Sequence, residues 1–385
     1  MIAQNILAAN DGSKVYIALD HLASPTEDGA SLEVALPSGF AFRLRIYHDR
    51  ERKLLEDVIN DKASLPFQKA EAEKGLTVHL QRFLHAPAHH SSISNVHFRH
   101  VGFSPTVRLI KRWFSSHLLA PFISTELIEL VCAHVFLTSD SQSKPNTGPA
   151  GFARTMAFLS EWDWKCEPLI VPVHSIAGVD PTITLHFPSE KVEAVNSAFK
   201  ERRAVDPGMS AGAWHIATEE ELTGVFWCME GRGPTPMIAD RVKTLAKASW
   251  THIAKEAEPN DLGVKALFNH PLTDYDFIIH LDPNVLPRYS QNAFADESVW
   301  TGKMRPINLQ TGVTEEVMLD YDPARDFVDD LQRAYGDTML FFYDRMGGTV
   351  IAGLWNPLLR QPKPFRALLG YSSCADGQKV QYENV

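Results

Sequence analysis

The stretch Pro105-Thr-Val-Arg-Leu-Ile-Lys-Arg-Trp-Phe-Ser-Ser-His-Leu-Leu119 is the most informative part of the chain, and its spacing predicts a helix. Residues three, four and seven positions apart lie on one side of a helix. On one side of this helix they are basic or polar: Arg108, Lys111, Arg112 and Ser115. The opposite side is apolar: Leu109, Ile110, Trp113, Phe114 and Leu118. The pattern therefore predicts one buried face and one basic stripe.

The basic stripe has two interpretations. Most amphipathic helices have a polar face that contacts only water. The other interpretation is a contact with phosphate or with an acidic partner, because each guanidinium group binds phosphate through two donors. His100 and a further arginine extend the stripe toward the N-terminus. The candidate residues for an RNA or acidic-partner contact are Arg99, Arg108, Lys111 and Arg112.

The composition limits the classes of protein to which the chain can belong. The 385 residues are 44% hydrophobic and 22% charged, which is enough apolar material for two or three globular domains. The net charge of −10 does not favour binding of nucleic acid over the whole surface, so any such contact must come from a local basic patch. The first ten residues lack the pattern of a secretory signal, and no apolar run approaches the roughly 18 residues of a bilayer span. We therefore expect no membrane association.

The four cysteines lie far apart, and no two of them form a CxxC pair. This spacing predicts reduced thiols in a cytosolic or nuclear compartment rather than a disulfide framework or a zinc site. The residues are Cys132, Cys166, Cys228 and Cys374.

The N-terminal segment predicts two strands, Lys14–Leu19 and Phe40–Ile46, and then a charged helix from about Asp49 to Asn60. Two strands alone are only marginally stable. They belong either to a larger unit elsewhere in the chain or to a domain that starts before residue 1, and we favour the second.

Helical patterns dominate from about residue 91. Ser124 is suited to cap the N-terminus of the helix that follows, and this helix is apolar nearly all round, which predicts a central position. The segment between residues 175 and 212 looks irregular apart from one helix. The helices expected after the basic one are 125–137, 151–164, 190–202 and 241–253. Trp162 and Trp164 are expected to pack in the core.

The last third of the chain has an α+β pattern. A strand at Asp276–Leu281 precedes a helix that Asp322-Pro323 starts and Gly336 ends. One face of this helix is apolar: Ala324, Phe327, Val328, Leu331 and Tyr335. Two further strands form a hairpin: 339–343 and 350–355. This order predicts a small sheet with helices on one side.

Ordered motifs run along most of the chain. The first set is Pro87-Ala-His-His-Ser-Ser-Ile93, Thr106-Val-Arg-Leu-Ile-Lys-Arg-Trp113, His117-Leu-Leu119, Glu129-Leu130, Phe136-Leu137, Trp162-Asp-Trp164 and Pro168-Leu-Ile-Val171. The second set is Phe327-Val-Asp-Asp-Leu-Gln-Arg-Ala-Tyr-Gly-Asp337, Phe341-Phe-Tyr-Asp344, Gly347-Gly348 and Ile351-Ala-Gly-Leu-Trp-Asn-Pro357. Together these motifs resemble the Nrap family, the nucleolar RNA-associated proteins of the U3 small nucleolar RNA small-subunit processome.

The resemblance implies the C-terminal portion of a large protein built from two tandem units similar to CCA-adding enzymes and poly(A) polymerases. It implies an α+β multidomain fold. Residues 1–90 would hold part of a degenerate nucleotidyltransferase-like sheet, and residues 91–255 a helical domain similar to poly(A) polymerase and oligoadenylate synthetase. Residues 256–385 would form a C-terminal α+β sandwich-like domain.

The resemblance also implies a function. Members of the family are thought to be catalytically inactive scaffolds of early pre-ribosomes in the nucleolus of the nucleus. The implied partners are the other UTP-C proteins, namely a ribosomal-RNA-processing protein and casein kinase, together with pre-ribosomal RNA and U3 small nucleolar RNA. No cofactor is implied.

The residues themselves argue against catalysis. Nucleotidyl transfer needs two metal ions held by clustered carboxylates, typically an Asp-x-Asp pair after a Gly-Ser turn and a third acid on a neighbouring strand. Gly12-Ser13 is followed by Asp20-His-Leu22, which lacks the second carboxylate, and the strand 40–46 offers Arg43 and Arg45 where a third acid is expected. We therefore expect no catalytic residue. Two alternatives stay open: an active RNA nucleotidyltransferase fragment whose acids lie upstream, and a pure protein-binding module.

Two further patterns are weaker candidates. Thr273-Asp-Tyr-Asp276 looks like an Asp-x-Asp pair entering a strand, but Gly263-Val264 replaces the Gly-Ser turn, so capping carboxylates are the better interpretation. Five histidines crowd one stretch: His85, His89, His90, His97 and His100. Metal binding needs histidines that converge at set spacing. Because the stretch contains proline and serines, we expect a surface loop or helix cap rather than one continuous helix, and no metal site.

Overall fold

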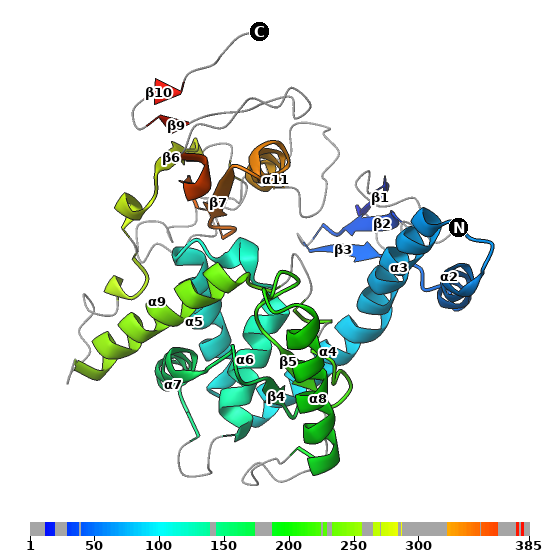
Figure 1. The fold of residues 1–385 in the computed structure, drawn as a ribbon, viewed down its shortest axis with the longest axis horizontal. Coiled ribbons are helices and arrows are strands. Elements are labelled where there is room, and N and C mark those ends of the chain that lie inside the picture. The colour runs from blue at the N-terminus through cyan, green and yellow to red at the C-terminus, as the bar shows by residue number, and fades with distance from the viewer. Residues whose placement is uncertain are drawn as a thin grey trace. The chain divides into compact units, whose positions relative to one another are not determined.

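The computed structural model shows a mixed α+β chain with small sheets (Figure 1). It describes residues 12–19, 29–37, 40–138, 144–173, 187–224, 226–228, 233–255, 265–269, 271–283, 286, 322–346, 348–360, 375–376 and 379–380. These separate into two compact units, one with the described residues up to 91 and one with those from 92 onward. No described helix combines the length and the apolar character needed to cross a bilayer.

The first unit contains a three-stranded antiparallel sheet. Its strands are β1 (Lys14–Leu19), β2 (Ala30–Ala35) and β3 (Ala41–Leu44), in the order β1-β2-β3. The two predicted strands are confirmed. The prediction missed β2, whose alanines and serine give little of the β-branched and aromatic signal that marks a strand. In the register, Leu32 pairs with both Ile17 and Leu44, so one face of the sheet is apolar across all three strands.

The predicted charged helix at about 49–60 is confirmed, whereas the helical structure that follows it before residue 91 was not predicted. Helix α2 (Glu51–Asn60) packs against α3 (Pro66–Leu80), whose proline stands at the first helical position. A π-helical turn, η1 (Gln81–His85), and α4 (Ala86–Arg99) follow without a break. The expectation of a histidine-rich loop is therefore wrong. Pro87 stands directly after the π turn, in which Ala86 N bonds to Gln81 O five residues back, and the helical run continues through it.

The second unit is largely helical. Its helical elements are α5 (Phe103–Ser116), η2 (Ala120–Phe122), α6 (Thr125–Thr138), α7 (Gly148–Glu161), α8 (Ser189–Val205) and α9 (Pro236–Lys255). Two short parallel strands pair beside them: β4 (Leu169–Val171) and β5 (Ile216–Thr218). The predicted helices are confirmed, with bounds shifted by a few residues. The predicted cap is confirmed too, because Ser124 Oγ accepts a hydrogen bond from Leu127 N at 3.4 Å.

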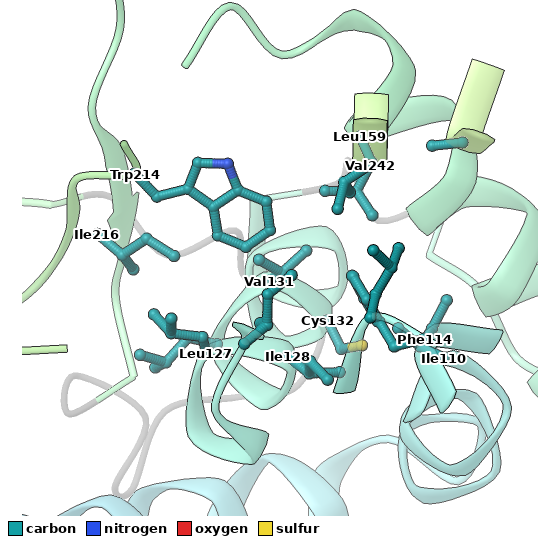
Figure 2. Packing of buried hydrophobic residues seen from close by; sticks show 14 of the residues in the cluster. Ile110, Phe114, Leu127, Ile128, Val131, Cys132, Leu159, Trp214, Ile216 and Val242 are labelled. Atoms are coloured by element: carbon teal, nitrogen blue, oxygen red, sulfur yellow. The ribbon is translucent and has the colours of Figure 1, made fainter. Parts of the chain in front are cut away.

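The helical core forms around α6, as its all-round apolar pattern predicts (Figure 2). Ile110 and Phe114 of α5 approach it from one side, and Trp214 and Ile216 approach from another. The side chains of Trp162 and Trp164 are 7% and 2% exposed, so their predicted core position is confirmed. A glycine sets the distance between two helices. A Cβ at Gly151 of α7 would overlap the side chain of Thr106 on α5, so only glycine allows this close approach.

The C-terminal part of the second unit is a small antiparallel sheet with a helix. Its elements are η3 (Leu272–Asp274), β6 (Phe277–His280), α11 (Pro323–Tyr335), β7 (Met339–Tyr343), β8 (Val350–Trp355), η8 (Pro357–Arg360), β9 (Ala375–Asp376) and β10 (Lys379–Val380). The sheet order is β6-β8-β7, and β7 and β8 form the predicted hairpin.

Helix α11 mostly follows its prediction. Asp322 Oδ1 accepts hydrogen bonds from Ala324 N at 3.1 Å and Arg325 N at 3.4 Å, and the helix ends at Gly336. Phe327 was expected on the buried face but is 43% exposed. The small sheet covers only a narrow stripe of the helix, and Val328 occupies its centre with 3% exposure.

The helical part and the C-terminal sheet share one core. Phe342 of β7 contacts Phe122 at a ring-centroid distance of 5.1 Å and Tyr275 at 5.2 Å. Arg241 of α9 donates a hydrogen bond to Tyr275 Oη at 3.0 Å, and its guanidinium group lies 5.6 Å from the Phe342 ring centroid. The basic helix α5 is therefore held inside a unit that includes the C-terminal sheet.

Candidate nucleic-acid interface

The predicted basic helix exists as α5, and its apolar side is buried as expected. Ile110 and Trp113 are fully buried, and Trp113 Nε1 donates a hydrogen bond to Ser249 Oγ of α9 at 3.1 Å. The helix ends in a reversal in which Leu118 adopts a positive φ of 58°. There the N–H of Leu118 bonds to Ser115 O and that of Leu119 to Phe114 O, which is a Schellman motif formed without glycine.

Ser115 does not belong to the basic face. It was expected in line with Arg108, but its exposure is 1%. The reason is its position in the last turn, over which the chain reverses at Leu118. Helical spacing predicts on which side of the helix a residue lies. It does not predict that the chain after the helix folds back and buries the last turn.

Two cations of the basic face form ion pairs within the chain. Lys111 Nζ lies 2.5 Å from Glu129 Oε1 of α6. Arg112 Nη1 lies 3.3 Å from Asp344 Oδ2, which follows β7. The Asp344 side chain is only 8% exposed, and its Oδ1 also accepts a hydrogen bond from Met346 N at 2.8 Å. Both cations therefore help to hold α5 against its neighbours, although the Arg112 side chain stays 43% exposed.

The other two candidate cations lie nearer the N-terminus of α5. Arg108 is exposed on the outer face of the helix. Arg99 ends α4 and is half-buried beside the turn that leads into α5. Burial lowers the pKa of His100 in this turn to about 4, and the charges of Lys144 and Arg99 add to the effect. His100 is therefore neutral at neutral pH, and the positive charge here comes from Arg99 and Lys144.

Sequence reasoning missed three side chains at this turn. Phe98 is 83% exposed, Val101 is 87% exposed, and Lys144 approaches from the segment before α7. The signal was present, since Phe98 stands between basic residues in His97-Phe-Arg-His100. The histidines of this stretch do not converge on a metal site, and no group of three or more His, Cys, Asp or Glu side chains suited to a metal ion occurs in the described part of the chain.

The position expected to carry a third catalytic acid holds an ion pair. Arg43 of β3 faces Glu33 of β2, and its Nε and Nη2 atoms lie 3.0 Å and 2.7 Å from Glu33 Oε1. Glu33 is 3% exposed. This carboxylate therefore binds a guanidinium group across the sheet. Asp20 and Gly263 lie outside the described residues.

The Asp-x-Asp pattern that precedes β6 has a structural explanation. Asp276 Oδ2 accepts a hydrogen bond from Trp355 N at 2.8 Å, and Asp276 N donates to Gly353 O at 3.0 Å. The carboxylate thus closes the end of the β6–β8 ladder. The interpretation of this residue as a capping carboxylate is confirmed.

Three of the four cysteines are described, and all three are free thiols, as predicted: Cys132, Cys166 and Cys228. Burial raises the pKa of Cys228 to about 12 and also raises that of Cys132. Both are therefore unreactive core residues. Cys374 lies outside the described residues.

Family models match the chain in three consecutive segments. Residues 1–98 match the Nrap protein nucleotidyltransferase domain 4, residues 100–270 match the Nrap protein PAP/OAS1-like domain 5, and residues 272–384 match the Nrap protein domain 6. The three segments follow one another along nearly the whole chain.

Curated relatives show the same likeness. U3 small nucleolar RNA-associated protein 22 of Schizosaccharomyces pombe is 30% identical over 370 residues, which cover 96% of this chain and 31% of the relative. Nucleolar protein 6 of Homo sapiens is 31% identical over 86% of this chain and 27% of the relative. U3 small nucleolar RNA-associated protein 22 of Saccharomyces cerevisiae is 24% identical over 95% and 32%. The chain thus spans about three tenths of the length of these relatives.

Proposed function

Because the chain belongs to the Nrap family, we propose that it acts in ribosome biogenesis and pre-ribosomal RNA processing, as a non-catalytic scaffold of the small-subunit processome in the nucleolus. One observation carries this proposal: three consecutive domain models of one family match the chain in order, and its relatives are named for the nucleolus and for U3 small nucleolar RNA.

The proposal includes a domain assignment. Residues 1–90 form part of a degenerate nucleotidyltransferase-like domain, residues 91–255 the helical domain, and residues 256–385 the C-terminal α+β domain. The shared core at Phe342 supports a scaffold in which the last two domains act as one body.

The non-catalytic part of the proposal is supported by the Arg43–Glu33 ion pair. A guanidinium group at a metal site repels Mg²⁺, and it occupies the carboxylate that faces it across the sheet. The test is nucleotide incorporation into RNA by the full-length protein with Mg²⁺. We expect no incorporation above background. Robust incorporation would instead establish the alternative, an active RNA nucleotidyltransferase.

The proposed contact with RNA or an acidic partner uses the four cations of the basic face in a graded way. Arg108 contributes most, because it is exposed on the outer face of α5, and Arg99 contributes beside it at the turn that leads into the helix. Arg112 contributes less, since Asp344 shares its charge, and Lys111 least, since its side chain is only 24% exposed. Phosphate contacts of this kind position a protein on RNA without reading sequence.

The proposed partners are the other UTP-C proteins, casein kinase among them, and pre-ribosomal RNA or U3 small nucleolar RNA. A charge reversal tests the RNA contact. Arg108→Glu is expected to reduce crosslinking to RNA in purified pre-ribosomal particles, and Lys200→Glu, an exposed cation on α8, serves as the matched control. Equal crosslinking by the two folded variants would favour a pure protein-binding module.

A further inference from the structure

Helical residues run without a break from Pro66 to Arg99, through α3, the π turn η1 and α4. In the described part of the chain, this run is also where the first compact unit passes into the second, between residues 91 and 92. Two irregularities follow each other near the middle of the run, first the π turn and then Pro87. Features of these two kinds are the usual sites of kinks in helices.

The π turn and the proline weaken the same part of the main chain. In the π turn, Ala86 N donates its hydrogen bond to Gln81 O, five residues back instead of four. Pro87 has no N–H, so it cannot form the next bond of the series. In a regular α-helix its ring would also clash with the carbonyl group four residues back. Fewer main-chain hydrogen bonds therefore resist bending here than in the regular turns of α3 and α4.

The helix is fixed on the N-terminal side of these irregularities. His79, near the end of α3, is 5% exposed, and its Nδ1 lies 3.0 Å from Glu51 Oε2 of α2. The His79 ring centroid lies 5.7 Å from that of Tyr47 and 5.2 Å from that of Phe83, which belongs to the π turn. The rings of Tyr47 and Phe83 also contact each other, at 5.4 Å. The start of the π turn is therefore held within the first unit.

The helix is fixed again on the C-terminal side. Val96 of α4 is fully buried in the helical core of the second unit, and Ile93 packs against the same core. Three side chains between these anchors are exposed to solvent: Leu84, Ala86 and Pro87. The irregular turn thus lies between two anchored ends, one in each unit, where a bend breaks the fewest core contacts.

We propose that residues 84–87 are a hinge about which the helical unit reorients relative to the first unit while both cores stay intact. Hinges are a few residues at the ends of elements that absorb a change in φ and ψ. The hinge goes beyond the proposed function and does not depend on it, because a scaffold can also be built from units in one fixed orientation. A scaffold with a hinge keeps its contacts while the particle around it changes shape.

The test is the distribution of distances between two nitroxide spin labels in the 385-residue chain, measured by pulsed electron paramagnetic resonance. The labels are attached at Lys62→Cys in the first unit and Lys200→Cys on α8, both at exposed positions. Cys166→Ser and Cys374→Ser remove two other thiols, and the remaining two cysteines are buried. A hinge predicts a broad distribution in the labelled chain that is otherwise unchanged.

Pro87→Ala restores the missing N–H and is expected to narrow the distance distribution about twofold, because the helix then bends less easily. Ala86→Gly adds backbone freedom in the same turn and is expected to broaden the distribution. Both side chains are exposed, so neither change removes a core contact.

The matched control is Pro66→Ala. Pro66 stands at the first position of α3, where an N–H has no acceptor within the helix, so the distribution should keep its width. A width that Pro87→Ala leaves unchanged, or that Pro66→Ala narrows equally, would overturn the hinge.

Discussion

The middle of α5 and the turn between α4 and α5 are both basic in sequence, but their basic side chains have different neighbours. In the middle of α5, Lys111 and Arg112 each face a carboxylate from another element, at 2.5 Å and 3.3 Å. In the turn between α4 and α5, the charge of Arg99 adds to the burial that lowers the pKa of Lys144. Basic residues that lie close in sequence can therefore have different neighbours in the fold: a carboxylate for Lys111 and for Arg112, and the cation Lys144 near Arg99.

The largest expected effect comes from a change on the buried side of α5, which supports both regions. Trp113→Ala removes a fully buried side chain and its hydrogen bond to Ser249, so we expect a loss of about 3–5 kcal/mol in the free energy of unfolding. Urea denaturation measures it. Phe98→Ala is the matched control, since the same measurement should change by less than about 0.5 kcal/mol for an exposed side chain. Equal losses would show that Phe98 has a structural role.

Mild acid should destabilise the helical core. Burial lowers the pKa of His134 to about 4, and its Nδ1 donates to Ile170 O at 3.0 Å. As the pH falls, the unfolded chain, with a histidine pKa near 6.5, binds the proton before the folded chain does. The contribution of neutral His134 to the free energy of unfolding is therefore fully present well above pH 6.5 and is lost as the pH drops toward 4. The loss by pH 5 is about 2 kcal/mol for this histidine. His134→Gln should flatten this pH dependence in urea titrations, and an unchanged slope would contradict the assignment.

The ion pair between α5 and the C-terminal sheet should have a smaller effect. Asp344→Ala removes both the Arg112 contact and the acceptor for Met346 N, with an expected cost of about 1–2 kcal/mol. Asp344→Asn keeps the acceptor and loses only the charge, so the expected cost is below about 1 kcal/mol because Arg112 is half exposed to solvent. Thermal unfolding separates the two variants. If Asp344→Asn cost as much stability as Asp344→Ala, the ion pair with Arg112 would contribute more to stability than the hydrogen bond from Met346 N.

The smallest expected effect compares an exposed cation and a paired cation of α5 directly on RNA. Arg108→Gln should weaken binding of the full-length protein to a labelled oligouridylate about three- to fivefold and reduce the slope of log affinity against log salt by about 0.7, as for one lost phosphate contact on a single strand. Arg112→Gln should change affinity less than about twofold, because Asp344 already neutralises part of its charge. Anisotropy titrations from low to high salt measure both, and a reversed order would refute the comparison.

Much of the fold followed from local sequence signals. The Asp322-Pro323 start of α11, the Ser124 cap of α6 and the amphipathic spacing of α5 each act within one or two turns. Such signals are written in adjacent residues. The misses depended on distant context: β2 is specified by its pairing with β1 and β3, and the helix across Pro87 by the π turn before it.

The candidate site shows the same limit. Helical spacing placed Arg108, Lys111 and Arg112 on one face, as the structure has them. It could not show that Arg112 meets Asp344, because 232 positions separate them in sequence. Nor could it bring Lys144 beside Arg99, since that approach depends on the glycine contact between the segment before α7 and the turn before α5.

The most direct test of the account is crosslinking of RNA to the full-length protein in purified pre-ribosomal particles, with the crosslinked peptides identified by mass spectrometry. A scaffold that contacts RNA through the basic face of α5 predicts crosslinks at Arg108 and its neighbours, reduced in Arg108→Glu, with fewer on the paired cations Lys111 and Arg112. Crosslinks confined to α5 beyond Arg108, or none anywhere in the second unit, would contradict it.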